Sequence, residues 1–208
     1  MDLNKKTPWH LEYNGGLVPV WETTKGDIII ESKVVMDYIE EAYSTQGYSF
    51  LPVDPVLRAK NRIAYNLIDG LNGAWYPMYF KKASDEAGIK ALKEKLQKIE
   101  DFIAANNTNP DKSAFVQGTE NPTQLDAHIY VHVERINMMK DSVFHEVFWV
   151  PTGFHNYPHI LKLLAAIRAR PEFKGVLANT KPYHEHVKKV HEAPQGVKVG
   201  LYLPIENE

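Results

Sequence analysis

The chain has 208 residues with a formal net charge of −2, and 44% of them are hydrophobic, which is the composition of a globular protein of one or two domains. The near-neutral charge excludes the strongly basic surface that draws proteins to nucleic acid or anionic membranes, and the lack of cysteine excludes disulfides and thiolate chemistry within this chain. The sequence contains neither an apolar stretch long enough to span a bilayer nor a signal-peptide pattern, so we expect a cytoplasmic protein with no membrane or nucleic-acid partner.

The first third of the chain predicts a small α/β unit. A β-prone run over 17–21, a polar turn containing glycine and a run of isoleucines over 28–30 predict a hairpin. Pro19 has no N–H for a strand ladder, so it predicts an edge position or a special geometry such as a cis bond. Ser32 is a favourable N-cap, and apolar residues at helical spacing follow it as far as Tyr43. Two strands and one helix are too little sheet to be stable alone.

The remainder predicts helices. Asp54-Pro55 is a helix start, and this first long helix is expected to end around 70–77. Ser84 is expected to cap a second helix, and Thr123 with Asp126 forms a variant capping box at the start of a third. Further helical stretches are expected over 157–169, 172–178 and 181–191, and a strand-like tail over 197–203.

The predicted fold class is therefore α/β followed by all-α. The expected divisions are an α/β domain over 1–45, a linker over 46–53, an all-helical domain over 54–192 and a tail over 193–208.

Six stretches occur in a characteristic order, at 6–9, 14–20, 26–43, 54–59, 115–118 and 123–126. Together they resemble the cytosolic glutathione transferases, the omega-like class most closely, over nearly the whole chain up to about residue 191. The resemblance implies a partial thioredoxin-like domain that binds glutathione, a helical domain that lines the site for an electrophile, and a homodimer.

The resemblance also implies roles for individual residues. Val18 would pair its backbone with the cysteinyl part of glutathione, and Pro19 would be a cis-proline. Glu31 and Ser32 would hold the γ-glutamyl end, and Lys6 would approach the glycyl carboxylate. A carboxylate can hold an amine, and a hydroxyl at a helix N-terminus suits an anionic group. The alternative is that Ser32 serves only as an N-cap and Glu31 only as a favourable charge near the helix start. The neighbouring Leu-Val-Pro-Val run over 17–20 favours glutathione binding instead.

Aromatic residues gather near the end of the first long helix, where the family has its electrophile site. Trp75, Tyr76 and Tyr79 are the candidates, because aromatic faces suit apolar substrates, although packing between helices explains them equally well. Leu163 stands where omega-like relatives often carry a tryptophan, so the usual substrate range is in doubt.

No residue is assigned as catalytic. In the omega-like class a Cys-Pro pair lies at a helix N-terminus, which lowers the pKa of the thiol. Residues 1–4 correspond to the family's second strand or its end, so we expect the segment that carries this cysteine to be absent. Three explanations stay open: an incomplete record of a longer enzyme, a truncated product with little activity, or a specialised non-catalytic protein, of which the first two are favoured. A transferase that uses Tyr13 or Ser32 is a weaker alternative.

The expected function is that of a glutathione S-transferase-like protein acting in detoxification, through conjugation of small electrophiles or reduction of mixed disulfides in the complete family member. Low activity is expected of this chain. The alternative is a non-catalytic scaffold that uses the helical domain to dimerise. No metal cofactor is expected: His128 and His132 have metal-ligand spacing but are interpreted as boundary histidines, and His184, His186 and His191 as a solvated helix face.

Overall fold

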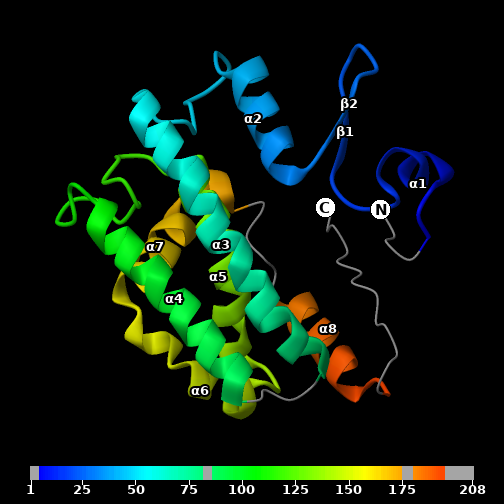
Figure 1. Ribbon diagram of the computed structural model, residues 1–208, viewed down its shortest axis with the longest axis vertical. Helices are drawn as coiled ribbons and strands as arrows, with labels where there is room; N and C mark the ends of the chain where they lie inside the picture. The colour runs from blue at the N-terminus through cyan, green and yellow to red at the C-terminus, as the bar shows by residue number, and fades with distance from the viewer. Residues whose placement is uncertain (1–4, 82–85, 175–179, 195–208) are drawn as a thin grey trace. The chain divides into compact units, whose positions relative to one another are not determined.

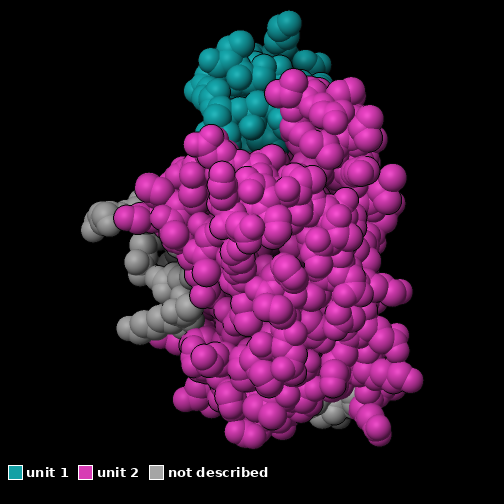
Figure 2. Space-filling model, turned by 90° about the vertical axis from the view of Figure 1, so that its left-hand side faces the viewer, with its two compact units in different colours: residues 1–51, 200–202 teal, residues 52–199, 203–208 magenta. Residues whose placement is uncertain are grey.

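The computed structural model describes residues 5–81, 86–174 and 180–194, with the side chains of 76–81 and 180–182 left aside. The described residues form two compact units, one up to Leu51 and one from Pro52 onward (Figures 1 and 2). The N-terminal unit combines a short sheet with helices and the second unit is helical, which confirms the predicted fold class. Within the described ranges, none of the helices is long and apolar enough to cross a membrane.

The N-terminal unit is organised around a two-stranded hairpin. Strands β1 (Val20–Glu22) and β2 (Ile28–Ile30) run antiparallel, as predicted. Helix α2 (Ser32–Tyr43) begins directly after β2 and packs against it. Helix α1 (Pro8–Asn14) packs against β1.

Helix α1 is absent from the sequence predictions, although its start carries a recognisable signal. The Thr7 hydroxyl accepts the N–H of His10 at 3.3 Å, and Pro8 occupies the first helical position. A threonine cap followed by proline is a favourable helix start. Gly15 then ends the helix with a φ of 55°, a left-handed conformation that glycine adopts without a steric penalty.

The start of α2 differs from the prediction in one respect. Ser32 is the first helical residue rather than the N-cap; Glu31 occupies the cap position with a φ of 71°. With Glu31 at the cap position, the helix begins one residue earlier than predicted, and the serine hydroxyl does not act as the cap.

The second unit is a bundle of long helices. Helix α3 (Pro55–Lys81) packs against α4 (Glu86–Asn106) and α5 (Gln124–Asn137), and α7 (Pro158–Ala169) packs against α4 and α5 (Figure 1). The last described helix, α8 (Thr180–Glu192), contacts α3.

Shorter pieces connect these helices. Between α5 and α7 the chain forms η1 (Met138–Asp141), the π-helical η2 (His145–Trp149), α6 (Val150–Thr152) and η3 (Phe154–Asn156), and η4 (Pro171–Phe173) follows α7.

The core of this unit is built from apolar stripes at helical spacing. Side chains at helical spacing on three helices are almost fully buried: Leu92, Leu96, Ile99 and Ile103 on α4, Leu125, Ile129, Val133 and Ile136 on α5, and Ile160, Leu164 and Ile167 on α7. The prediction that the first long helix ends around 70–77 is wrong, because α3 continues through Pro77 to Lys81. The local propensities of glycine and proline thus did not indicate the end of α3, a helix that as a whole packs against α4 and α5.

Some predictions fall outside the described residues. These are the strand at 1–4, the cap at Ser84, part of the helical stretch over 172–178 and the strand-like tail at 197–203.

Candidate functional site

The predicted glutathione-binding residues gather at one end of the β1–β2 hairpin. Val20 lies opposite Ile30 in the antiparallel register, so the residues just before Val20 and just after Ile30 leave the hairpin at the same end. Val18 and Pro19 therefore lie at the end where Glu31 and Ser32 begin α2. Val18, Glu31 and Ser32 are all exposed, so this end can be reached from solvent within the unit. The Val18–Pro19 peptide bond is cis, which agrees with the expectation for Pro19.

Side chains of α1 hold the segment that leads into this end. The Nε2–H of the buried His10 donates to the Leu17 carbonyl at 2.8 Å. The Asn14 amide donates to the carbonyls of Leu17 at 3.2 Å and Pro19 at 3.3 Å. Sequence reasoning missed both side chains, because a histidine and an asparagine bonded to a nearby backbone leave no spacing pattern.

Lys6 lies against the same segment. A Cβ atom added to Gly16 would lie 2.6 Å from Lys6 Cδ and 3.2 Å from Lys6 Nζ, so the lysine side chain passes directly over this glycine. Gly16 has a φ of 79° and leaves room for the lysine. The structure thus places the Lys6 ammonium against Gly16, which precedes Val18 by two residues.

The N-terminus of α2 offers a second kind of recognition. The N-cap residue of α2, Glu31, makes no side-chain capping hydrogen bond, and both Glu31 and Ser32 are exposed. A helix N-terminus presents backbone N–H groups and a partial positive charge, which suit an anionic ligand group. The Glu31 carboxylate beside it suits a cationic group, so the pair matches a ligand end that carries both an amine and a carboxylate.

The electrophile-site candidates lie on the helical unit. Trp75 is 3% exposed and its indole N–H donates to the Asn72 side chain at 3.1 Å, and Leu163 is fully buried on α7. Their burial favours the packing explanation for these two residues. The side chains of Tyr76 and Tyr79 lie outside the described part of the chain, although both residues belong to α3.

The predicted capping box at the start of α5 is present. Asp126 Oδ2 accepts the Thr123 N–H at 2.6 Å and the Thr123 hydroxyl at 2.7 Å, while Oδ1 accepts the Val116 N–H at 2.7 Å. Burial raises the pKa of Asp126, and these hydrogen bonds oppose the rise. The Gln117 amide donates to the Asn61 side chain at 2.6 Å, so the loop before α5 is bonded to both α5 and α3. This network is a structural support rather than a ligand site.

A cleft of about 480 Å³ opens between α5 and α7, and the sequence analysis did not anticipate it. An ion pair between the buried Glu134 and Arg168 lies in its lining, together with Tyr130 and His184. Burial and the neighbouring Glu134 charge raise the pKa of Tyr130. The Nε2–H of His184 donates to the Met138 carbonyl at 3.0 Å, so this histidine is bonded to the helical unit rather than forming part of a freely solvated face.

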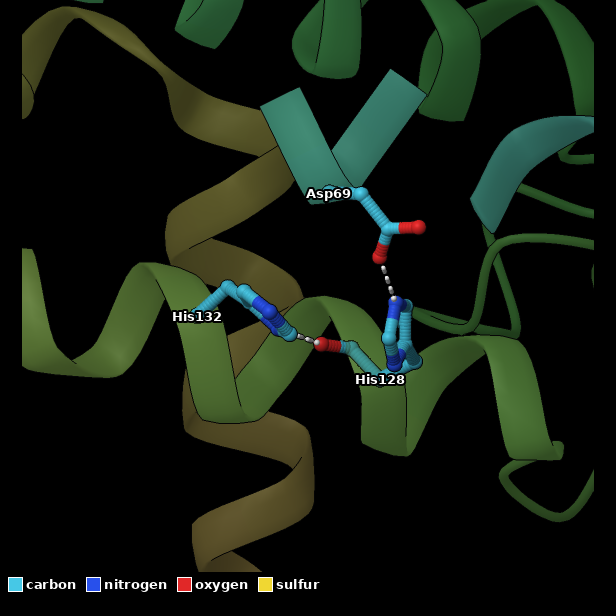
Figure 3. Close-up of side chains that lie close together, drawn as sticks. All are labelled: Asp69, His128 and His132. Atoms are coloured by element: carbon cyan, nitrogen blue, oxygen red, sulfur yellow. Dashed lines mark hydrogen bonds and ion pairs between the residues drawn. The ribbon is translucent and has the colours of Figure 1, made fainter. Parts of the chain in front are cut away.

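The two histidines with metal-ligand spacing meet a carboxylate from another helix. His128 and His132 lie on α5, and Asp69 of α3 faces them (Figure 3). One ligand atom from each residue lies within 4.8 Å of the others. Sequence reasoning considered the histidines alone, because Asp69 is 59 residues from His128.

No family model matches the chain. The chain is 25% identical to glutathione S-transferase omega-1 of Rattus norvegicus over 205 residues, which cover 97% of the chain and 78% of that protein. It is 28% identical to the omega-1 protein of Sus scrofa over 141 residues, or 67% of the chain and 56% of that relative. The tau-class glutathione S-transferase of mango has a similar structure, with a TM-score of 0.73, 25% identity and coverage of 91% of the chain and 84% of that protein.

The chain is a relative of the glutathione transferases. Two of its sequence relatives carry the omega-class name, as the resemblance in the six stretches implies. The match to the pig transferase spans little more than half of that protein's length. The fold of the described chain, a small sheet-containing unit followed by a helical bundle, agrees with this similarity.

Proposed function

We propose that the N-terminal unit binds glutathione at the end of the β1–β2 hairpin. The antiparallel register carries this proposal, because it brings Val18 and Pro19 to the end where Glu31 and Ser32 start α2. The name shared by the sequence relatives, glutathione S-transferase omega-1, supports glutathione as the ligand.

Each part of the tripeptide has a matching group. The exposed Glu31 carboxylate takes the free amine of the γ-glutamyl end, while Ser32 and the α2 N-terminus take its carboxylate. The Val18 backbone pairs with the cysteinyl moiety as an extra strand would. The Lys6 ammonium, held over Gly16, takes the glycyl carboxylate.

Isothermal titration of reduced glutathione into the purified chain tests the proposal. Removing a hydrogen bond to a charged group costs ~1.5–3 kcal/mol, so Glu31→Ala and Ser32→Ala each weaken binding by about tenfold or more. Glu41→Ala and Ser44→Ala, exposed changes near the other end of α2, leave the affinity unchanged. Equal affinities for all four variants and the parent chain contradict the proposed site.

The proposed chemistry of this chain is glutathione-dependent but slow. The proposed chemistry is conjugation of small electrophiles or reduction of mixed disulfides, and the present sequence has no cysteine to act as its own nucleophile. A thioltransferase assay on the purified chain is therefore expected to give negligible turnover even where glutathione binds. Fast turnover would show that another residue activates the thiol.

The second candidate function is a dimerising scaffold, supported by the extensive helical core. Such a scaffold passes through a glutathione-affinity resin, and Glu31→Ala changes none of its properties. The proposed glutathione-binding protein is retained by the resin and eluted by free glutathione. We also propose a homodimer in the cytoplasm, to be checked by light scattering and by fractionation.

A further inference from the structure

The side chains of Asp69, His128 and His132 form a compact group of nitrogen and oxygen atoms between two packed helices of the helical unit. His128 Nε2 lies 3.3 Å from Asp69 Oδ1, while His128 and His132 have ring centroids 4.7 Å apart. Figure 3 shows the Asp69 carboxylate reaching from α3 toward the His128 ring on α5, with the His132 ring one turn further along the same helix. Two zinc ligands at ~2.0–2.2 Å from the ion in tetrahedral geometry are about 3.3–3.5 Å apart, so the Asp69–His128 pair already has the separation of two ligands on one ion.

The hydrogen bond that His132 makes through Nδ1 determines which of its two ring nitrogens carries the proton. His132 Nδ1 lies 2.8 Å from the His128 carbonyl oxygen, which can only accept, so Nδ1 carries the proton. In the neutral ring Nε2 then keeps its lone pair. Metal-binding histidines characteristically donate the other ring N–H to a carbonyl or carboxylate in this way.

We propose that Asp69, His128 and His132 bind one divalent transition-metal ion, with Zn²⁺ as the best match. Imidazole nitrogens and one carboxylate are a donor set suited to zinc, and three protein ligands leave a fourth position for water. The site joins α3 to α5, which are already packed together.

The exposure of the three residues fits entry of an ion from solvent. His128 is buried and His132 is half-buried, while the Asp69 side chain is 43% exposed. The carboxylate therefore lies on the open side of the group and the histidines on the packed side. Within the residues that the structure describes, no other group of three metal-ligating side chains comes together in this way.

The ordinary alternative is a hydrogen bond between Asp69 and His128 that stabilises the helix packing without any ion. The two explanations differ at His132. An Asp–His hydrogen bond does not need the His132 ring, whereas an ion coordinated by all three residues does. They also differ at the carboxylate, because an asparagine at 69 can still accept a hydrogen bond but is a much weaker ligand.

The test is calorimetric titration of ZnCl₂ into the purified, metal-stripped full chain, with CoCl₂ absorption as the second readout. The parent chain is expected to bind one zinc ion and to give the visible cobalt spectrum of a low-coordinate site with nitrogen and oxygen ligands. Asp69→Asn and His132→Ala each weaken zinc binding by at least about tenfold and abolish the cobalt spectrum, because each removes a ligand. His155→Ala, an exposed histidine on η3, leaves both readouts unchanged.

Thermal unfolding in the presence of zinc tests zinc binding even if a variant is less stable than the parent chain. Zinc raises the Tm of the parent chain and of His155→Ala in a concentration-dependent way, and it does not raise the Tm of Asp69→Asn or His132→Ala. The proposal is overturned if the parent chain binds no zinc, or if Asp69→Asn and His132→Ala bind it as tightly as the parent. These results are independent of glutathione binding, whose residues lie in the other unit.

Discussion

The two units of the chain differ in how much of their structure is buried. In the described part of the N-terminal unit, the buried side chains are those of His10 and Val35. In the helical unit, whole stripes on α4, α5 and α7 are almost fully buried. A two-stranded sheet with little core gains little free energy from burial, whereas packed helices gain much more. The proposed glutathione site is therefore built on the weakly packed unit, and the proposed metal site on the strongly packed one.

The largest expected effect is a core truncation in the helical unit. Leu96→Ala removes a fully buried side chain and lowers the free energy of unfolding by ~2–5 kcal/mol, as for other buried leucines. Val35→Ala is the matched change in the N-terminal unit, and it leaves the unfolding transition of the helical unit unchanged. Chemical denaturation followed by native-state hydrogen exchange measures both.

In that experiment Val35→Ala is expected to reduce protection only in the hairpin and α2. If Val35→Ala lowered protection across α4 and α5 as Leu96→Ala does, the units would unfold together and the contrast between them would be wrong.

The next effect concerns the network that joins the loop before α5 to the bundle. Asp126→Ala removes a carboxylate that accepts the Thr123 and Val116 N–H groups in a buried position. Losing the cap and leaving the Val116 N–H unpaired together lower the free energy of unfolding by ~2–4 kcal/mol. Urea denaturation of this variant and of Asp111→Ala, an exposed control in the same loop, gives the comparison. Similar midpoints for the two variants would show that the network contributes little.

The smallest effect is a pH dependence that comes from α8. Burial and the neighbouring Lys189 charge lower the pKa of His186 below its ordinary 6.5. As the pH falls below 6.5, the unfolded chain therefore takes up a proton at His186 before the folded chain does. The free energy of unfolding decreases over this range as the pH falls. Above that pH both states are neutral and the residue contributes no slope.

Replacing the histidine isolates this contribution. His186→Gln makes the acid side of the stability–pH profile shallower by at most about one proton, measured by denaturation at a series of pH values. His191→Gln, an exposed residue on the same helix, is the control. An unchanged slope in His186→Gln would mean that this residue titrates alike in both states.

Much of the local structure follows from short-range patterns. The spacing of Val35 and its neighbours indicates α2, the apolar stripes indicate the buried faces of α4, α5 and α7, and Thr123 with Asp126 indicates a capping box. Such features depend on residues within a few positions of one another, which is why the sequence reveals them. The binding roles expected for the residues at the hairpin end came from the family resemblance instead.

The features that the sequence did not reveal depend on contacts between distant segments. Helix α3 continues through Pro77 although proline has a low local helix propensity, and the helix as a whole packs against the distant α4 and α5.

The sequence by itself determined the hairpin, the starts of most long helices and the apolar faces of those helices. The tertiary structure alone decided that Asp69 meets His128 and His132, since α3 must pack on α5 before the three side chains share one site. Hydrophobic periodicity specifies which face of a helix is buried, but it does not specify which residue of another helix lies opposite.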